Sequence, residues 1–246
     1  MEKDRQIYKN DFSHIVYAVI YMAIMAAGMY VSYHVFGYDY DNPKIDTVLI
    51  YFEFPMSVYA ICVYIKNYKG TSFNKLKMTF SFVMFSVLMI LLMVFYLIQG
   101  TYKQESQYFI YVVITTIFVA FSEEVMYRGI VLSGFLKKYT IVKAIVYSSI
   151  LFALLHTVNI LGGVSIKSML IQLANTFVLG IVLACFRVKN KNIIPLILYH
   201  FIWDIILISS PFVERYLLLI TAIVGVSIVF AILLPIQIYK QDISDK

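Results

Sequence analysis

Three charged residues lie close together within a stretch, residues 109–135, that is otherwise mostly apolar. They are Glu123, Glu124 and Arg128. Ionisable side chains inside a membrane helix are costly to bury, and they usually face a bundle interior, a partner or water. This stretch is therefore the first candidate for a functional site.

The spacing of the three charges gives them different roles. Glu124 and Arg128 are four residues apart, on one helical face and in the favourable acid-first order, so we expect them to form an ion pair. Glu123 is rotated by about 100° on the same helix. It has no partner on its own helix and can point at another group. An unpaired carboxylate of this kind is suited to act as a general base.

Two later apolar stretches carry further ionisable residues. His156 lies in the first, four residues after Phe152, and His200 and Asp204 lie in the second, again four residues apart. The aspartate can fix the orientation and tautomer of the imidazole. Counted from the nearest lysines at about 1.5 Å per residue, these groups and Glu123 all lie very roughly 14–21 Å deep. A shared depth is what a single site on several helices requires.

One glutamate and two histidines are sensible equipment for hydrolysis. The glutamate can activate water, and a histidine can assist or stabilise charge. The same set, Glu123, His156 and His200, could instead bind zinc and leave one position open for water. We favour a site without a metal or other cofactor and keep zinc as the alternative. The sequence has no G-x-S-x-G, H-E-x-x-H or P-loop motif.

The elements that position these residues are predicted to be membrane helices. The chain is 61% hydrophobic and 14% charged, whereas soluble domains are about half apolar and about a quarter charged. The apolar residues form runs of about 20, long enough to cross a bilayer. We predict an all-α polytopic membrane protein, a single transmembrane domain over residues 1–246 with about eight helices around an intramembrane polar cavity. The predicted spans are 12–36, 46–65, 78–99, 107–135, 141–158, 166–186, 192–210 and 213–238.

The loop charges predict the orientation in the membrane. Loops on one side carry 15 Lys and Arg residues and those on the other side carry 4. Because cytoplasmic loops are the richer in Lys and Arg, we expect a multi-pass protein of the cell membrane with both termini cytoplasmic. The net charge of +6 then reflects topology, and no nucleic-acid partner is expected. Glu53, two residues before Pro55 in the second span, is assigned no role.

Taken together, these residues resemble the CPBP family of intramembrane endopeptidases, the CAAX protease and bacteriocin-processing type also called Abi. The family pattern consists of E-E-x-x-x-R, F-x-x-x-H and H-x-x-x-N/D on separate helices. All three motifs occur here in order, and the resemblance covers about residues 80–210. They are represented by Glu123, Glu124, Arg128, Phe152, His156, His200 and Asp204.

The resemblance implies an eight-span fold with a cavity that opens toward the cytoplasm, and peptide-bond hydrolysis close to the membrane surface. It implies that Glu123 activates water with help from His156. His200 and Asp204 would bind the oxyanion or orient the cavity.

The resemblance also implies roles for the neighbours of these residues. Glu124 and Arg128 would form a structural pair. Phe152 and Tyr127, the latter at a position where the family commonly has Phe, would form the cavity wall.

The sequence thus predicts a bacterial intramembrane endopeptidase that acts in the lipid bilayer on a membrane-associated peptide or protein. Two other functions fit parts of the pattern. One is a non-catalytic membrane scaffold or regulator, of the bacteriocin-immunity or envelope-control type, with a vestigial site. The other is a transporter or proton relay, because buried Glu, His and Asp also suit that work.

Overall fold

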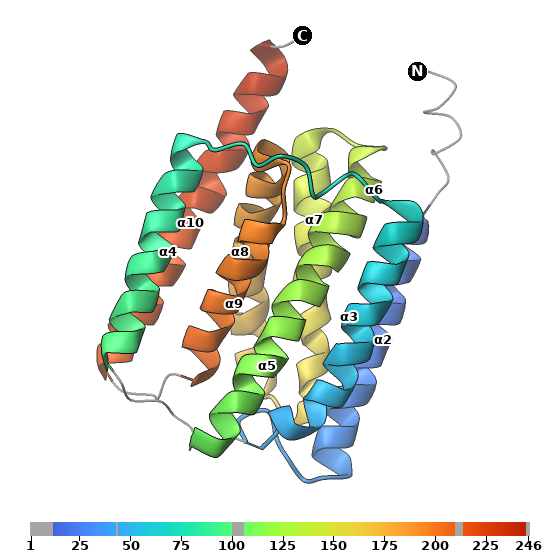
Figure 1. Ribbon diagram of the computed structural model, residues 1–246, viewed down its shortest axis with the longest axis vertical. Coiled ribbons are helices and arrows are strands. Elements are labelled where there is room, and N and C mark those ends of the chain that lie inside the picture. The colour runs from blue at the N-terminus through green and yellow to red at the C-terminus, as the bar shows by residue number, and fades with distance from the viewer. Residues whose placement is uncertain (1–11, 43, 100–105, 210–213, 245–246) are drawn as a thin grey trace.

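The protein is an all-helical bundle (Figure 1). The computed structural model describes residues 12–42, 44–99, 106–209 and 214–244. Within these ranges the only extended pairing is an isolated bridge between Phe73 and Asn192. The helices are α2 (Ser13–His34), α3 (Asp46–Asn67), α4 (Phe80–Gln99), α5 (Ser106–Glu123), η1 (Glu124–Val131), α6 (Leu132–Leu136), α7 (Ile141–Leu155), η2 (His156–Gly162), α8 (Ile166–Asn190), α9 (Ile194–Ser209) and α10 (Glu214–Ser244).

The predicted fold class is confirmed. Among the described residues, seven helical segments are long and apolar enough to cross a membrane, and the apolar part of α9, Ile194–Ile208, is shorter. Large apolar side chains cover the outer surface, with Phe80 82% exposed and Ile98 78% exposed. Such exposure would be unfavourable in water, but it matches the hydrocarbon of a bilayer.

The single helix predicted over residues 107–135 is interrupted. After α5 the chain forms a π-helix, η1, and the short helix α6 follows. The backbone N–H of Leu132 donates to the carbonyl of Tyr127, five residues earlier. A π turn holds more residues than an α turn, so residues four apart lie almost above one another. Gly129 allows the ring of Tyr64 to pack here, since a Cβ would lie 3.2 Å from its Cδ2.

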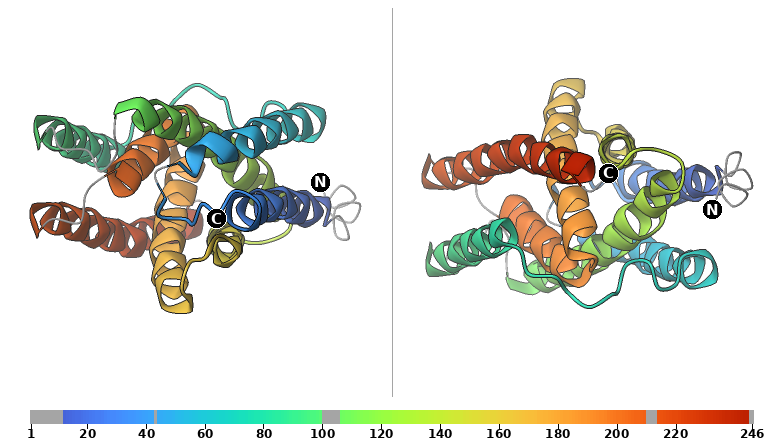
Figure 2. Two further views of the ribbon diagram at one scale, coloured as in Figure 1. Left: turned by 90° about the horizontal axis from the view of Figure 1, so that it is seen from below. Right: turned by 90° about the horizontal axis from the view of Figure 1, so that it is seen from above.

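A loop ties helices together at the end of the bundle that carries the start of α2 and the end of α10. This loop, the α3–α4 connection, runs along one side of that end (Figures 1 and 2). It is tied to the α8–α9 turn by backbone hydrogen bonds from Ile193 to Ser72 (3.0 Å) and from Asn74 to Lys191 (3.2 Å). Arg187 adds a side-chain bond to Ser72 Oγ at 2.9 Å.

The opposite end has a different construction. The α2–α3 connection lies against η2 and α8, with the Tyr40 N–H donating to the Gly162 carbonyl at 2.9 Å. Gln172 Nε2 donates to Tyr40 Oη at 3.2 Å, and Asn159 Nδ2 donates to Gln172 Oε1 at 3.0 Å. Burial raises the pKa of Tyr40 to about 12, so its hydroxyl stays neutral. These bonds hold a polar rim at this end.

Aromatic packing fixes α9, which carries two of the predicted site residues. Its Tyr199 contacts Phe82 and Phe85 of α4, with ring centroids 5.8 and 5.3 Å apart. Phe186 of α8 and Phe230 of α10 complete the cluster. Figure 2 shows the bundle from its two ends, with these helices tilted against one another. This apolar cluster sets the rotation of α9 and therefore the direction of the neighbouring His200.

Candidate active site

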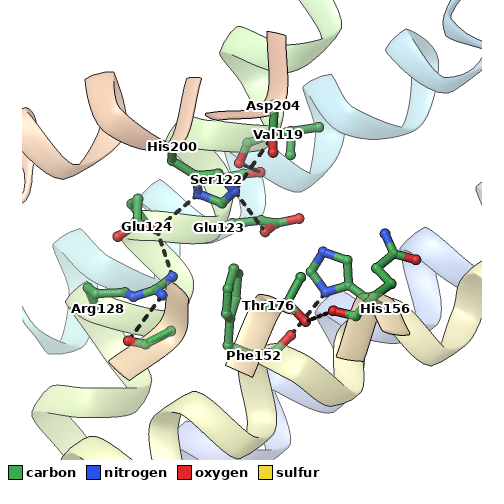
Figure 3. Close-up of polar contacts among 12 residues, drawn as sticks. Val119, Ser122, Glu123, Glu124, Arg128, Phe152, His156, Thr176, His200 and Asp204 are labelled. Carbon is green, nitrogen blue, oxygen red and sulfur yellow. Dashed lines mark hydrogen bonds and ion pairs between the residues drawn. The ribbon is translucent and has the colours of Figure 1, made fainter. Parts of the chain in front are cut away.

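His200 stands at the centre of a group of carboxylates (Figure 3). Its Nδ1 is 3.0 Å from Glu124 Oε1. Its Nε2 is 3.4 Å from Asp204 Oδ2 and 3.7 Å from Glu123 Oε2. An imidazole can donate at both nitrogens only as imidazolium. In that form Nδ1 of His200 would donate to Glu124, and Nε2 would face Asp204 and Glu123.

The pairing predicted for Glu124 and Arg128 is present. Arg128 Nη1 lies 2.6 Å from Glu124 Oε1, and both side chains are buried. Arg128 Nη2 also donates to the Gly180 carbonyl at 3.5 Å, and the guanidinium lies 4.1 Å from the centre of the Phe152 ring. The additional contact between Glu124 and His200 was missed, because sequence spacing carries no information on distances between helices.

Glu123 occupies the boundary between this cluster and an open space. It ends α5 just before the π-helix, and it is 5% exposed. Its Oε2 is buried and makes no hydrogen bond. The 3.7 Å separation from His200 is too long for a hydrogen bond, although it permits electrostatic attraction. Electrostatic attraction to His200 therefore positions the carboxylate, and its Oε2 remains free to accept a proton.

His156 is presented by a change of helix type. It is the first residue of the 3₁₀ helix η2, and its Nδ1 is 3.2 Å from the Phe152 carbonyl oxygen. A carbonyl oxygen only accepts hydrogen bonds, so Nδ1 carries the proton in the neutral ring and Nε2 is left as an acceptor. Phe152 packs edge-on against His156 at 5.4 Å and against His200 at 5.7 Å. The two histidines thus share contact with one aromatic ring.

A cavity of about 350 Å³ lies against these groups. Glu123, His156 and Asp204 line it, whereas His200 and the Glu124–Arg128 pair are not among its lining residues. Its rim includes Tyr40, Asn159 and Gln172.

Two wall predictions need correction. Phe152 and Tyr127 do not line the cavity but lie one layer behind it, both buried, with ring centroids 5.3 Å apart. They are large rings that fill the interior between helices, and the polar residues of α3, α5 and α8 take the positions facing the open space.

Sequence analysis missed Glu53. It lies in α3, is 1% exposed and lines the same cavity as Glu123. Both of its carboxylate oxygens are buried without a hydrogen-bond partner. A carboxylate inside an apolar span was itself a signal, but its place early in the span suggested a position near the headgroups.

The residues do not fit the alternative zinc site. Among the described residues, no three His, Cys, Asp or Glu side chains are arranged to hold a metal ion. Both histidines pack against the ring of Phe152, with centroid distances of 5.4 and 5.7 Å. We therefore derive no step through a metal.

The cavity opens at the end of the bundle that carries the α2–α3 connection. Asp41 and Ser168 are exposed rim residues there, and the α3–α4 loop lies at the other end (Figure 1). The start of α2 and the end of α10 are at that other end. The start of α2 and the cavity mouth therefore lie at opposite ends of the bundle, whereas the loop charges predict cytoplasmic termini and the family resemblance implies a mouth that faces the cytoplasm.

A comparison with family models supports the resemblance seen in the motifs. Residues 105–206 match the family described as type II CAAX prenyl endopeptidase Rce1-like. The family resemblance predicted from the motifs is confirmed. The Rce1-like segment runs from the start of α5 into α9 and contains all three motifs, and it indicates a membrane protease. A search of the curated proteins finds no match.

Proposed function

We propose that this protein is an intramembrane endopeptidase in which Glu123 activates a water molecule. The observation that carries the proposal is the free Oε2 of Glu123, which is buried at the wall of a cavity that His156 and Asp204 also line. A general base needs an unengaged acceptor next to space for water and substrate. Glu123 meets both conditions.

The proton transfers follow from the two free acceptors. A water between Glu123 and His156 would donate one hydrogen bond to Oε2 and one to His156 Nε2, which is the acceptor while Nδ1 donates to Phe152. As the water oxygen attacks the peptide carbonyl, Glu123 takes a proton. The resulting carboxylic acid then passes that proton to the leaving amine, so the base becomes the acid of the second step.

His200 acts in this scheme as a positioning residue. Its ring reaches Glu123 and Asp204, which line the cavity, but His200 itself does not. Because His200 lies beside Glu123 but does not line the cavity, we assign it the role of orienting Glu123 and not that of contacting an oxyanion. The Asn175 side chain lines the cavity and offers a neutral N–H donor for that role.

The substrate proposed is a membrane-associated peptide or protein in the cell membrane. We retain the orientation given by the loop charges, with both termini cytoplasmic, which places the cavity mouth on the opposite face. The cavity is bounded by membrane helices on its sides. A peptide would therefore reach Glu123 from the outer end of the bundle.

The test compares membrane peptides of cells that carry the wild type or Glu123→Gln. The substitution keeps the size of the side chain but replaces the basic carboxylate with an amide, so an uncleaved precursor of the substrate should accumulate. Asp39→Asn is the matched control, because Asp39 is exposed and outside the cavity lining, and it should behave as wild type. An unchanged peptide pattern, with full biological activity of Glu123→Gln, would instead favour a scaffold or regulator.

A further inference from the structure

Glu53 is a buried acid that the proposed hydrolysis does not use. Both of its oxygens lack a hydrogen-bond partner, and the side chain lines the cavity. An unsatisfied buried carboxylate is expensive, and each such group in a folded protein calls for an explanation. A ligand that enters the cavity would supply the missing partner.

The whole cavity is acidic. Among the described residues, five carboxylates line it and no Lys or Arg does. They are Asp41, Asp46, Glu53, Glu123 and Asp204. Arg128 pairs with Glu124 behind the wall, and Lys44 lies over the ring of Tyr108. Like charges that share a poorly solvated space repel one another, and a cation would relieve that repulsion.

We propose that the cavity selects peptides with a cationic group next to the cleaved bond, and that Glu53 binds this group. The inference rests on the proposed function, because it assumes that the ligand is a peptide whose carbonyl lies at Glu123. Glu53 and Glu123 line one continuous cavity from neighbouring helices, α3 and α5. A peptide bound for attack at Glu123 therefore places an adjacent group near Glu53. A charge-assisted bond to a buried carboxylate is stronger than a neutral one.

The chain contains its own reporter for this test. Trp203 is the single tryptophan, it is 4% exposed, and it lines the cavity. Its fluorescence can report peptide binding to the full protein in lipid nanodiscs, without any hydrolysis. The probes are short apolar peptides with blocked ends that differ at one position, Lys, Gln or Glu, and a Gln peptide with a free amino terminus.

We expect the Lys peptide to bind about tenfold or more tightly than the blocked Gln peptide, and the Glu peptide to bind most weakly. Glu53→Gln should remove the preference for Lys and leave affinity for the blocked Gln peptide unchanged. Asp39→Asn should keep the full preference. Tighter binding of the free-amine peptide alone would assign the cationic group to the peptide terminus instead of a side chain.

Other results would overturn the inference. They are equal binding of the Lys, free-amine and blocked Gln peptides by wild type, a preference for the cationic peptide that persists in Glu53→Gln, or displacement of the cationic peptide by Mg²⁺ at equal concentration. If Glu53→Gln does not fold, Asp46→Asn serves as the second variant and should reduce the preference. A Lys preference without any cleavage would refute the protease and keep only the binding of cationic peptides at Glu53, whereas cleavage without preference would refute this inference and keep the protease.

Discussion

Two layers of polar residues meet at Glu123, and they are built differently. The inner cluster consists of Glu124, Arg128 and His200, which contact one another at 2.6 and 3.0 Å and are at most 2% exposed. The cavity wall carries Glu53 and His156. Glu53 has no hydrogen-bond partner, and His156 bonds only to the backbone among the described contacts.

This difference indicates that the inner cluster holds the fold together and that the cavity wall carries the reactive groups. The contacts of the inner cluster hold three segments, η1, α8 and α9, in one arrangement, although Glu124 Oε2 makes no hydrogen bond. Side chains with unused donors and acceptors keep their capacity for water and substrate. Substitutions in the inner cluster should therefore damage folding, whereas those in the cavity wall should damage binding or chemistry and leave the fold intact.

The largest effect is expected from breaking the ion pair of the inner cluster. Arg128→Met leaves the buried Glu124 without its cation, which typically costs about 3–5 kcal/mol. The measurement is the unfolding midpoint of the purified protein in detergent. The double variant Glu124→Gln with Arg128→Met removes both charges and should be more stable than the single variant. Equal stability of the wild type and Arg128→Met would break the distinction between the layers.

A cavity-wall substitution should have the opposite profile. His156→Ala is expected to lower hydrolysis of the precursor identified in cells by about 10²–10⁴-fold, because the attacking water loses one of its two acceptors. Its unfolding midpoint should stay near the wild-type value. His34→Ala is the matched control, since His34 is exposed at the end of α2. Loss of folding without a specific loss of hydrolysis would place His156 with the inner cluster.

The smallest effect is expected at the rim. Tyr40→Phe removes the acceptor of the Gln172 side chain and should cost about 0.5–1.5 kcal/mol. The change should appear as faster amide hydrogen exchange in the α2–α3 connection, with little effect elsewhere. Tyr38→Phe, in the same connection but outside this chain of hydrogen bonds, should exchange as wild type. Uniform acceleration across the bundle would show that the rim and the inner cluster are one unit.

The sequence predicted the helices well because membrane thickness fixes their length. The spans predicted at 46–65 and 192–210 differ from α3 and α9 by only a few residues. The Glu124–Arg128 pair was also predictable, because spacing within one helix determines proximity. The π-helix that begins at Glu124 was not, since a shift of one residue in the hydrogen-bond register leaves no mark on the hydropathy pattern.

Relations between helices account for the other differences. The contact of His200 with Glu124 depends on how α9 packs against η1, which aromatic packing around Tyr199 decides. The role of Glu53 depends on which face of α3 meets the cavity. The position of the cavity mouth depends on loops at both ends of the bundle. Sequence spacing along single helices contains none of this information.

The central claim is that Glu123 is the base that activates water. The most direct test is hydrolysis of the identified precursor by purified Glu123→Gln in lipid nanodiscs, with peptide binding followed through Trp203. The account predicts a loss of hydrolysis of about 10²-fold or more, with the precursor still bound and the fold retained. Hydrolysis at the wild-type rate by a folded Glu123→Gln protein would contradict it.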